Sequence, residues 1–119
     1  MAVIATKAST IPEIIEACGK HGVRAAVILS AGFSEAGPQG VALERAVIEN
    51  ARRYGGRLIG PHWHGIPRPS GGLNATFSNG GATAGKLQLI SQTGAPCTAS
   101  LDWAHTTEFG FFRIISNGA

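Results

Sequence analysis

Two histidines, His62 and His64, flank Trp63 in the glycine-bounded stretch Gly60–Gly65. An extended chain turns residues two apart to the same side, so both imidazoles could reach one ion. Neutral imidazole is the commonest side-chain ligand of copper and zinc. Two ligands hold a metal weakly, and structural sites use four. A metal here therefore needs further ligands, for which the chain offers His105, His21, Cys97 and Asp102.

Two other readings of the histidine pair stay open. They could be ordinary surface histidines of a loop, or one of them could act as a general base without any metal. A spacing of one residue between two histidines does not by itself decide among the three.

A second candidate site is the turn formed by Ser91, Gln92, Thr93, Gly94 and Ala95. It follows an apolar strand and precedes a helix, where free backbone N–H groups attract phosphate and other anions. An ordinary strand-to-helix turn is the alternative. Ser34 and Glu35 also follow a strand end, which is where α/β sheets bind ligands.

Composition narrows the class of protein. The 119 residues include 44% hydrophobic and 14% charged residues and carry a net charge of +3. The basic residues are scattered, which argues against nucleic acid and favours a small anionic ligand. Sparse surface charge fits either an oligomer or a piece that packs against another protein. Open sheet edges and uncovered apolar helix faces predict a homodimer or larger assembly. Cys18 and Cys97 lack metal-type spacing, which predicts reduced thiols.

The same sequence shows no targeting or membrane signal. No apolar run approaches the ~18 residues that a membrane span needs. The start lacks the basic segment of a secretory signal. We therefore expect a cytoplasmic protein with no membrane association.

Strand and helix signals alternate along the chain. Strands are expected at Ala2–Ala5, Val23–Leu29 and Arg57–Ile59, separated by a helix capped by Thr10 and a second helix over residues 41–54. The continuous apolar run within Val23–Leu29 is typical of a buried parallel strand, so this order predicts a parallel βαβαβ sheet. The residues between 61 and 85 are rich in glycine and proline and break the alternation. A strand at Leu87–Ile90, a helix over 96–106 and a strand at Phe109–Ile115 then predict a second βαβ unit.

Six motifs now line up in order with one known family. They are Ala2-Val3-Ile4-Ala5-Thr6, Ala31-Gly32-Phe33-Ser34-Glu35, Arg57-Leu58-Ile59-Gly60-Pro61, Gly72-Leu73-Asn74-Ala75-Thr76-Phe77, Leu89-Ile90-Ser91-Gln92-Thr93-Gly94-Ala95 and Leu101-Asp102-Trp103-Ala104. The set resembles the NDP-forming acyl-CoA synthetases and the protein acetyltransferases that carry a synthetase-like region. It is similar, more distantly, to the alpha subunit of succinyl-CoA synthetase.

The resemblance implies an α/β protein with a truncated Rossmann-like parallel sheet (βαβαβ) followed by a flavodoxin-like βαβ unit. Residues 1–66 would be the C-terminal half of a CoA-binding domain, 67–85 a connector, and 86–119 the first βαβ of a ligase-type domain. The family's Gly-rich nucleotide turn, phosphohistidine segment and ATP-grasp domain would then lie outside this chain. We therefore do not expect the family's ligase reaction from the chain alone.

The sequence departs from the family pattern in the opening stretch. In the family, the Gly-Pro pair is usually followed by Asn and then Cys or Ser, whereas this chain has His62 and Trp63. In the family the loop that matches Ser91–Ala95 meets the phosphohistidine or the phosphate, and Thr93 here replaces the commoner Ser.

Two functional hypotheses follow. The one we favour from the sequence is a small metalloprotein on a synthetase scaffold, a copper- or zinc-dependent hydrolase of ester, phosphoester or glycoside bonds with His62 and His64 as ligands. The alternative is a non-catalytic acyl-CoA- or nucleotide-binding remnant, with CoA or acyl-CoA as its ligand.

Overall fold

The computed structural model describes residues 1–76, 82–107 and 109–116. They form two compact units, which we call the N-terminal unit (Met1–His62) and the C-terminal unit (Trp63–Ala119). Both are mixtures of helix and strand with parallel pairing, so the predicted α/β class is confirmed.

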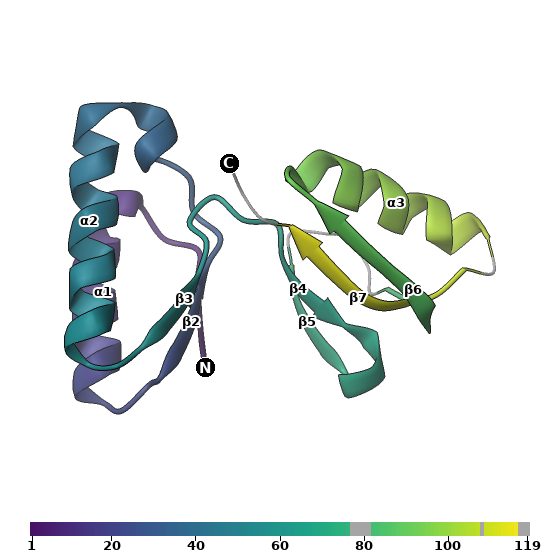
Figure 1. Ribbon diagram of the computed structural model, residues 1–119, viewed down its shortest axis with the longest axis horizontal. Helices are drawn as coiled ribbons and strands as arrows, with labels where there is room; N and C mark the ends of the chain where they lie inside the picture. The colour runs from purple at the N-terminus through teal and green to yellow at the C-terminus, as the bar shows by residue number, and fades with distance from the viewer. Residues whose placement is uncertain (77–81, 108, 117–119) are drawn as a thin grey trace. The chain divides into compact units, whose positions relative to one another are not determined.

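The N-terminal unit is a βαβαβ fold, as the sequence predicts. Its elements are β1 (Ala2–Ile4), the 3-10 turn η1 (Ala8–Thr10), α1 (Ile11–Lys20), β2 (Ala25–Ile28), the 3-10 turn η2 (Ser34–Ala36), α2 (Pro38–Arg53) and β3 (Arg57–Ile59). The strands are parallel in the order β1-β2-β3. Because each crossover advances the sheet in the same direction, both helices lie on one side of it (Figure 1).

The core of this unit forms where the helices meet the sheet. Alternate strand residues face the helices, and the apolar stripes of α1 and α2 cover them. The buried cluster comprises Ile4, Ile11, Ile15, Ala26, Ile28, Phe33, Val47 and Ala51. Thr10 is the N-cap residue of α1, as predicted, but its hydroxyl donates to the Lys7 carbonyl oxygen at 2.8 Å and makes no capping hydrogen bond to the helix.

The C-terminal unit begins with an antiparallel hairpin. Its strands are β4 (Gly65–Arg68) and β5 (Leu73–Thr76), joined through the 3-10 turn η3 (Pro69–Gly71). This hairpin occupies part of the segment that we expected to be a connector. The assignment of residue ranges to the family's domains stays a prediction.

A parallel βαβ unit follows, again as predicted. It consists of β6 (Ala84–Ser91), α3 (Gly94–Thr106) and β7 (Phe111–Ser116). Cys97, Leu101 and Ala104 of α3 pack against Phe111 and Ile114 of β7.

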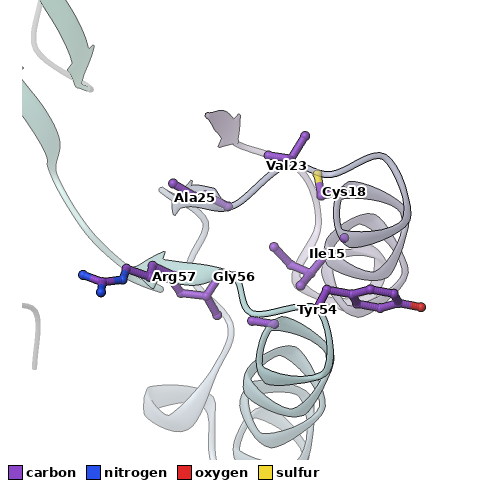
Figure 2. A pocket seen from close by; sticks show the side chains of 11 residues that line it. Ile15, Cys18, Val23, Ala25, Tyr54, Gly56 and Arg57 are labelled. Carbon is purple, nitrogen blue, oxygen red and sulfur yellow. The ribbon is translucent and has the colours of Figure 1, made fainter.

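A small hollow of the N-terminal unit lies at the end of the sheet where β2 and β3 begin. It is lined by apolar groups of α1 and by residues such as Val23, Ala25 and Tyr54 (Figure 2). Its volume of about 10 Å³ leaves room for no more than a single water. A ligand larger than water therefore does not fit at this end of the strands.

Candidate functional site

The three strands of the N-terminal unit end beside one another. The Ser30 hydroxyl, after β2, donates to the Thr6 carbonyl oxygen, after β1, at 2.6 Å. The His62 backbone N–H, after β3, donates to the Ser30 carbonyl oxygen at 2.9 Å. These bonds fix the loops at the carboxyl edge of a parallel sheet, where α/β proteins bind ligands.

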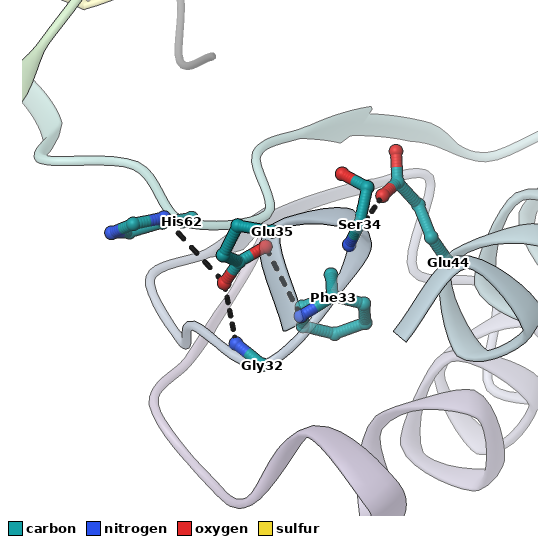
Figure 3. Close-up of polar contacts among 6 residues, drawn as sticks. All are labelled: Gly32, Phe33, Ser34, Glu35, Glu44 and His62. Atoms are coloured by element: carbon teal, nitrogen blue, oxygen red, sulfur yellow. Dashed lines mark hydrogen bonds and ion pairs between the residues drawn. The ribbon is translucent and has the colours of Figure 1, made fainter. Parts of the chain in front are cut away.

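Glu35 is the carboxylate of this edge. Its Oε1 accepts a hydrogen bond from the Gly32 backbone N–H at 2.6 Å, and its Oε2 accepts one from Phe33 at 3.2 Å (Figure 3). Burial acts to raise the pKa of Glu35, but the backbone N–H groups of Gly32, Glu35 and Phe33 together hold it below its ordinary value. Glu35 is therefore ionised at neutral pH.

His62 lies against this carboxylate. Its Nδ1 is 3.5 Å from Glu35 Oε1, and 59% of its side chain is exposed. The backbone of His62 is left-handed, with φ at +53°. Histidine and asparagine adopt this conformation more readily than most residues, so His62 is compatible with a turn that carries Asn in the family pattern. The imidazole ring of His62 is a group that can accept a proton, which the Asn of the family pattern cannot provide.

His64 occupies a different environment, in the C-terminal unit. Its side chain is buried beside the first turn of α3, where its Nδ1 is 3.4 Å from Thr98 Oγ1. A Cβ added to Gly94 would lie 3.3 Å from His64 Cβ. Burial lowers the pKa of His64, which disfavours its protonated form.

The metal-hydrolase hypothesis is wrong. It assumed an extended chain through the histidine pair, whereas the left-handed turn at His62 is not extended. His62 contacts Glu35 and His64 contacts Thr98, each within its own unit. Within residues 1–76, 82–107 and 109–116, no group of three or more His, Cys, Asp or Glu side chains could hold a metal ion.

The proposed additional ligands are dispersed. His21 follows the last residue of α1, while Cys97, Asp102 and His105 lie on α3. Cys97 is buried in the core, and burial raises the pKa of its thiol despite a hydrogen bond with Ser91. Cys18 and Cys97 are both free thiols in the structure.

The Ser91–Ala95 turn joins β6 to α3. The Ser91 hydroxyl donates to the Thr93 carbonyl oxygen at 2.9 Å and lies 3.3 Å from the Thr93 backbone nitrogen. Gln92, Thr93 and Ala95 are exposed at the N-terminus of α3. Ser34, the other predicted contact, is exposed and donates its backbone N–H to Glu44 at 3.2 Å.

Sequence reasoning missed part of this site. Thr6, Ser30 and Gly32 bring the strand ends together largely through backbone groups, which no side-chain spacing reveals. The sequence feature that could have indicated these three residues is that each is small or carries a hydroxyl and lies shortly after an apolar strand.

Comparison with known proteins gives a consistent result. The chain is 40% identical over 118 residues to the acetate–CoA ligase [ADP-forming] I of Archaeoglobus fulgidus. It is 39% identical over 118 residues to the acetate–CoA ligase [ADP-forming] I subunit alpha of Pyrococcus furiosus. Both alignments cover 99% of this chain. No family model matches.

The solved structures agree. The dinucleotide-forming acetyl-coenzyme A synthetase 1 of Ca. Korarchaeum cryptofilum, in its apo form, has a TM-score of 0.88 and 34% identity over 98% of this chain. The chain is homologous to one segment of the NDP-forming acyl-CoA synthetases. This confirms the resemblance inferred from the six motifs.

The match covers a minor part of each synthetase. The chain spans 17% of the Archaeoglobus ligase, 26% of the Pyrococcus subunit and 25% of the Korarchaeum synthetase. One of these relatives is named as a subunit, which is compatible with an oligomer. No helix among the described residues is long and apolar enough to cross a membrane.

Proposed function

We propose that the chain binds CoA or an acyl-CoA at the carboxyl ends of β1, β2 and β3. The observation that carries the proposal is the similarity of 99% of the chain to acetate–CoA ligases. This replaces the hydrolase hypothesis with the alternative that the sequence had left open.

The chemistry of the strand ends supports such a ligand. CoA combines anionic phosphates with a neutral arm that carries amides and a thiol. Lys7, which is exposed and follows β1, supplies positive charge for the phosphates. Glu35 supplies a hydrogen-bond acceptor for amide or hydroxyl donors.

Calorimetric titration of the purified chain with CoA, acetyl-CoA and ADP tests the proposal. We expect CoA binding to weaken about 10- to 150-fold in Lys7→Glu, since a charge-assisted contact contributes about 1.5–3 kcal/mol. Lys86→Glu is the matched control, because Lys86 is an exposed lysine on β6 of the C-terminal unit. An unmodified chain that binds neither CoA nor acetyl-CoA, or equal losses in both variants, would contradict the proposal.

We also propose that the Ser91–Ala95 turn binds a phosphate group. The support is the exposed N-terminus of α3, a helix of 13 residues, where free N–H groups favour anions. Gly94→Pro, which removes a backbone N–H at this turn, and Gly94→Ala, which keeps it, test this site separately from the first.

A homodimer or larger assembly, located in the cytoplasm, completes the proposal. The support for an assembly is the apolar side chains that the two parallel sheets leave exposed, including Val3, Ile59, Leu87 and Ile90. Light scattering on the purified chain at micromolar concentration should give at least twice the monomer mass of 12.3 kDa.

A further inference from the structure

We propose that His62 is a general base for the thiol of a CoA-type ligand, and that Glu35 is its positioning residue. This inference rests on the proposed CoA binding at the same strand ends. It assigns a chemical role to an imidazole that the family pattern does not have.

The negative charge of the site favours the neutral thiol end of such a ligand over its anionic phosphate end. Glu35 carries a full negative charge that its backbone hydrogen bonds stabilise. Glu44, whose carboxylate accepts the Ser34 backbone N–H, adds a second acidic group nearby (Figure 3). Two carboxylates repel the phosphates of CoA, whereas a thiol is mostly neutral at pH 7.

The geometry around His62 suits proton transfer. The Nδ1 atom faces Glu35 Oε1 at 3.5 Å, and Figure 3 shows the second ring nitrogen pointing away from that carboxylate. The backbone of His62 is held by its hydrogen bond to Ser30. An imidazole oriented by a carboxylate, with its other nitrogen open to the ligand, is the arrangement of a general base.

The step itself is a single proton transfer. The S–H bond breaks, its electron pair stays on sulfur as the thiolate, and the proton forms a new N–H bond at Nε2 of His62. The resulting imidazolium faces the ionised Glu35, which stabilises its positive charge. No oxidant, reductant or further reactant is required.

The expected effect can be bounded. An ordinary thiol with a pKa of about 8.5 is roughly 3% thiolate at pH 7. Because the thiolate is the nucleophile, complete deprotonation can accelerate alkylation by no more than about 30-fold. We expect the chain to accelerate alkylation of bound CoA about tenfold at pH 7.

The experiment measures iodoacetamide alkylation of CoA saturated with the chain at pH 7, with S-alkylated CoA quantified by chromatography so that Cys18 and Cys97 do not contribute. His62→Gln should bind CoA within about twofold of the unmodified chain but alkylate it at the rate of free CoA. Glu35→Gln keeps an acceptor oxygen for the Gly32 amide, but it loses the negative charge and the acceptor for the Phe33 N–H. It should lose part of the acceleration, and the rate is compared at saturating CoA so that a change in affinity does not contribute. Glu49→Gln, an exposed change on α2, is the control and should keep the full acceleration.

The outcomes separate the two proposals. An unmodified chain that binds no CoA overturns the proposed function and this inference with it. A chain that binds CoA without accelerating alkylation, or a His62→Gln variant that still accelerates it, overturns this inference alone. A Glu35→Gln variant with the full rate removes the positioning role of the carboxylate.

Discussion

The buried imidazole of His64 should make the stability of the C-terminal unit depend on pH. Burial lowers its pKa in the folded chain, so the unfolded chain binds the proton more tightly. The contribution is fully present above the ordinary histidine pKa of about 6.5 and is lost as pH falls below it. Because a single proton is involved, the free energy of unfolding can fall by no more than about 1.4 kcal/mol per pH unit.

Tryptophan fluorescence can follow this unit alone. The chain has two tryptophans, Trp63 and Trp103, and both lie in the C-terminal unit. Urea unfolding at intervals between pH 5 and 8 gives the free energy of unfolding by linear extrapolation. We expect a steeper fall in that free energy below pH 6.5 for the unmodified chain than for His64→Gln.

An exposed histidine on the same unit provides the control. His105→Gln removes an imidazole from the last turn of α3 without changing the buried one. If His64→Gln keeps the pH slope of the unmodified chain, or His105→Gln removes as much of it, burial of His64 is not the cause.

Three further predictions concern packing, anion binding and thiol reactivity. Gly40→Ala should lower the free energy of unfolding by about 3 kcal/mol or more, because its Cβ would overlap the Phe33 backbone carbonyl just before η2. Gly56→Ala is the control, since its Cβ would meet only ordinary contacts, and it should change the free energy by no more than about 1 kcal/mol. Urea unfolding followed by circular dichroism measures both values, and equal losses would refute the packing argument. Gly94→Pro removes one backbone N–H at the first residue of α3, where proline is tolerated, whereas Gly94→Ala keeps that N–H. Phosphate titration followed by NMR should show weaker binding in the proline variant only. Equal affinities would exclude this amide from the site. With Ellman's reagent, Cys18 should react before Cys97, which is buried and has a raised pKa; two thiols reacting together in the folded chain would contradict the buried position.

The alternation of strands and helices could be predicted from the sequence because burial imposes it. Ile11 and Ile15 recur at helical spacing and are both buried in the structure. The apolar run at Ala25–Ile28 became the central strand of the parallel sheet. Such periodic signals average over many residues, so one unusual backbone angle does not erase them.

The hairpin β4–β5 gave no comparable signal. Pro67 lies within β4, and Gly72 adopts a positive φ of 66° just before β5. Glycine and proline in or beside a short segment predict a loop, because both have a low propensity for β-strands. The pairing of Gly65 with Thr76 emerges only when the two strands are side by side.

Packing around Gly94 changes what a substitution at this position would test. From sequence, glycine at a helix start suggests room for an anion to approach the backbone. In the structure, a Cβ at Gly94 would instead meet the His64 side chain at 3.3 Å. A bulky residue there would therefore disturb His64 packing as well as phosphate binding, so the proline and alanine pair separates these effects.

The two histidines differ because the backbone turns between them. With φ at +53°, the chain at His62 leaves the extended path on which residues two apart share a side. His62 is consequently exposed beside an ionised carboxylate, while His64 is buried with a lowered pKa. The proton-transfer role that we propose therefore concerns His62 alone, whereas burial disfavours the protonated form of His64. A variant that replaces both at once would merge a chemical effect with a loss of stability, so each histidine has to be changed alone.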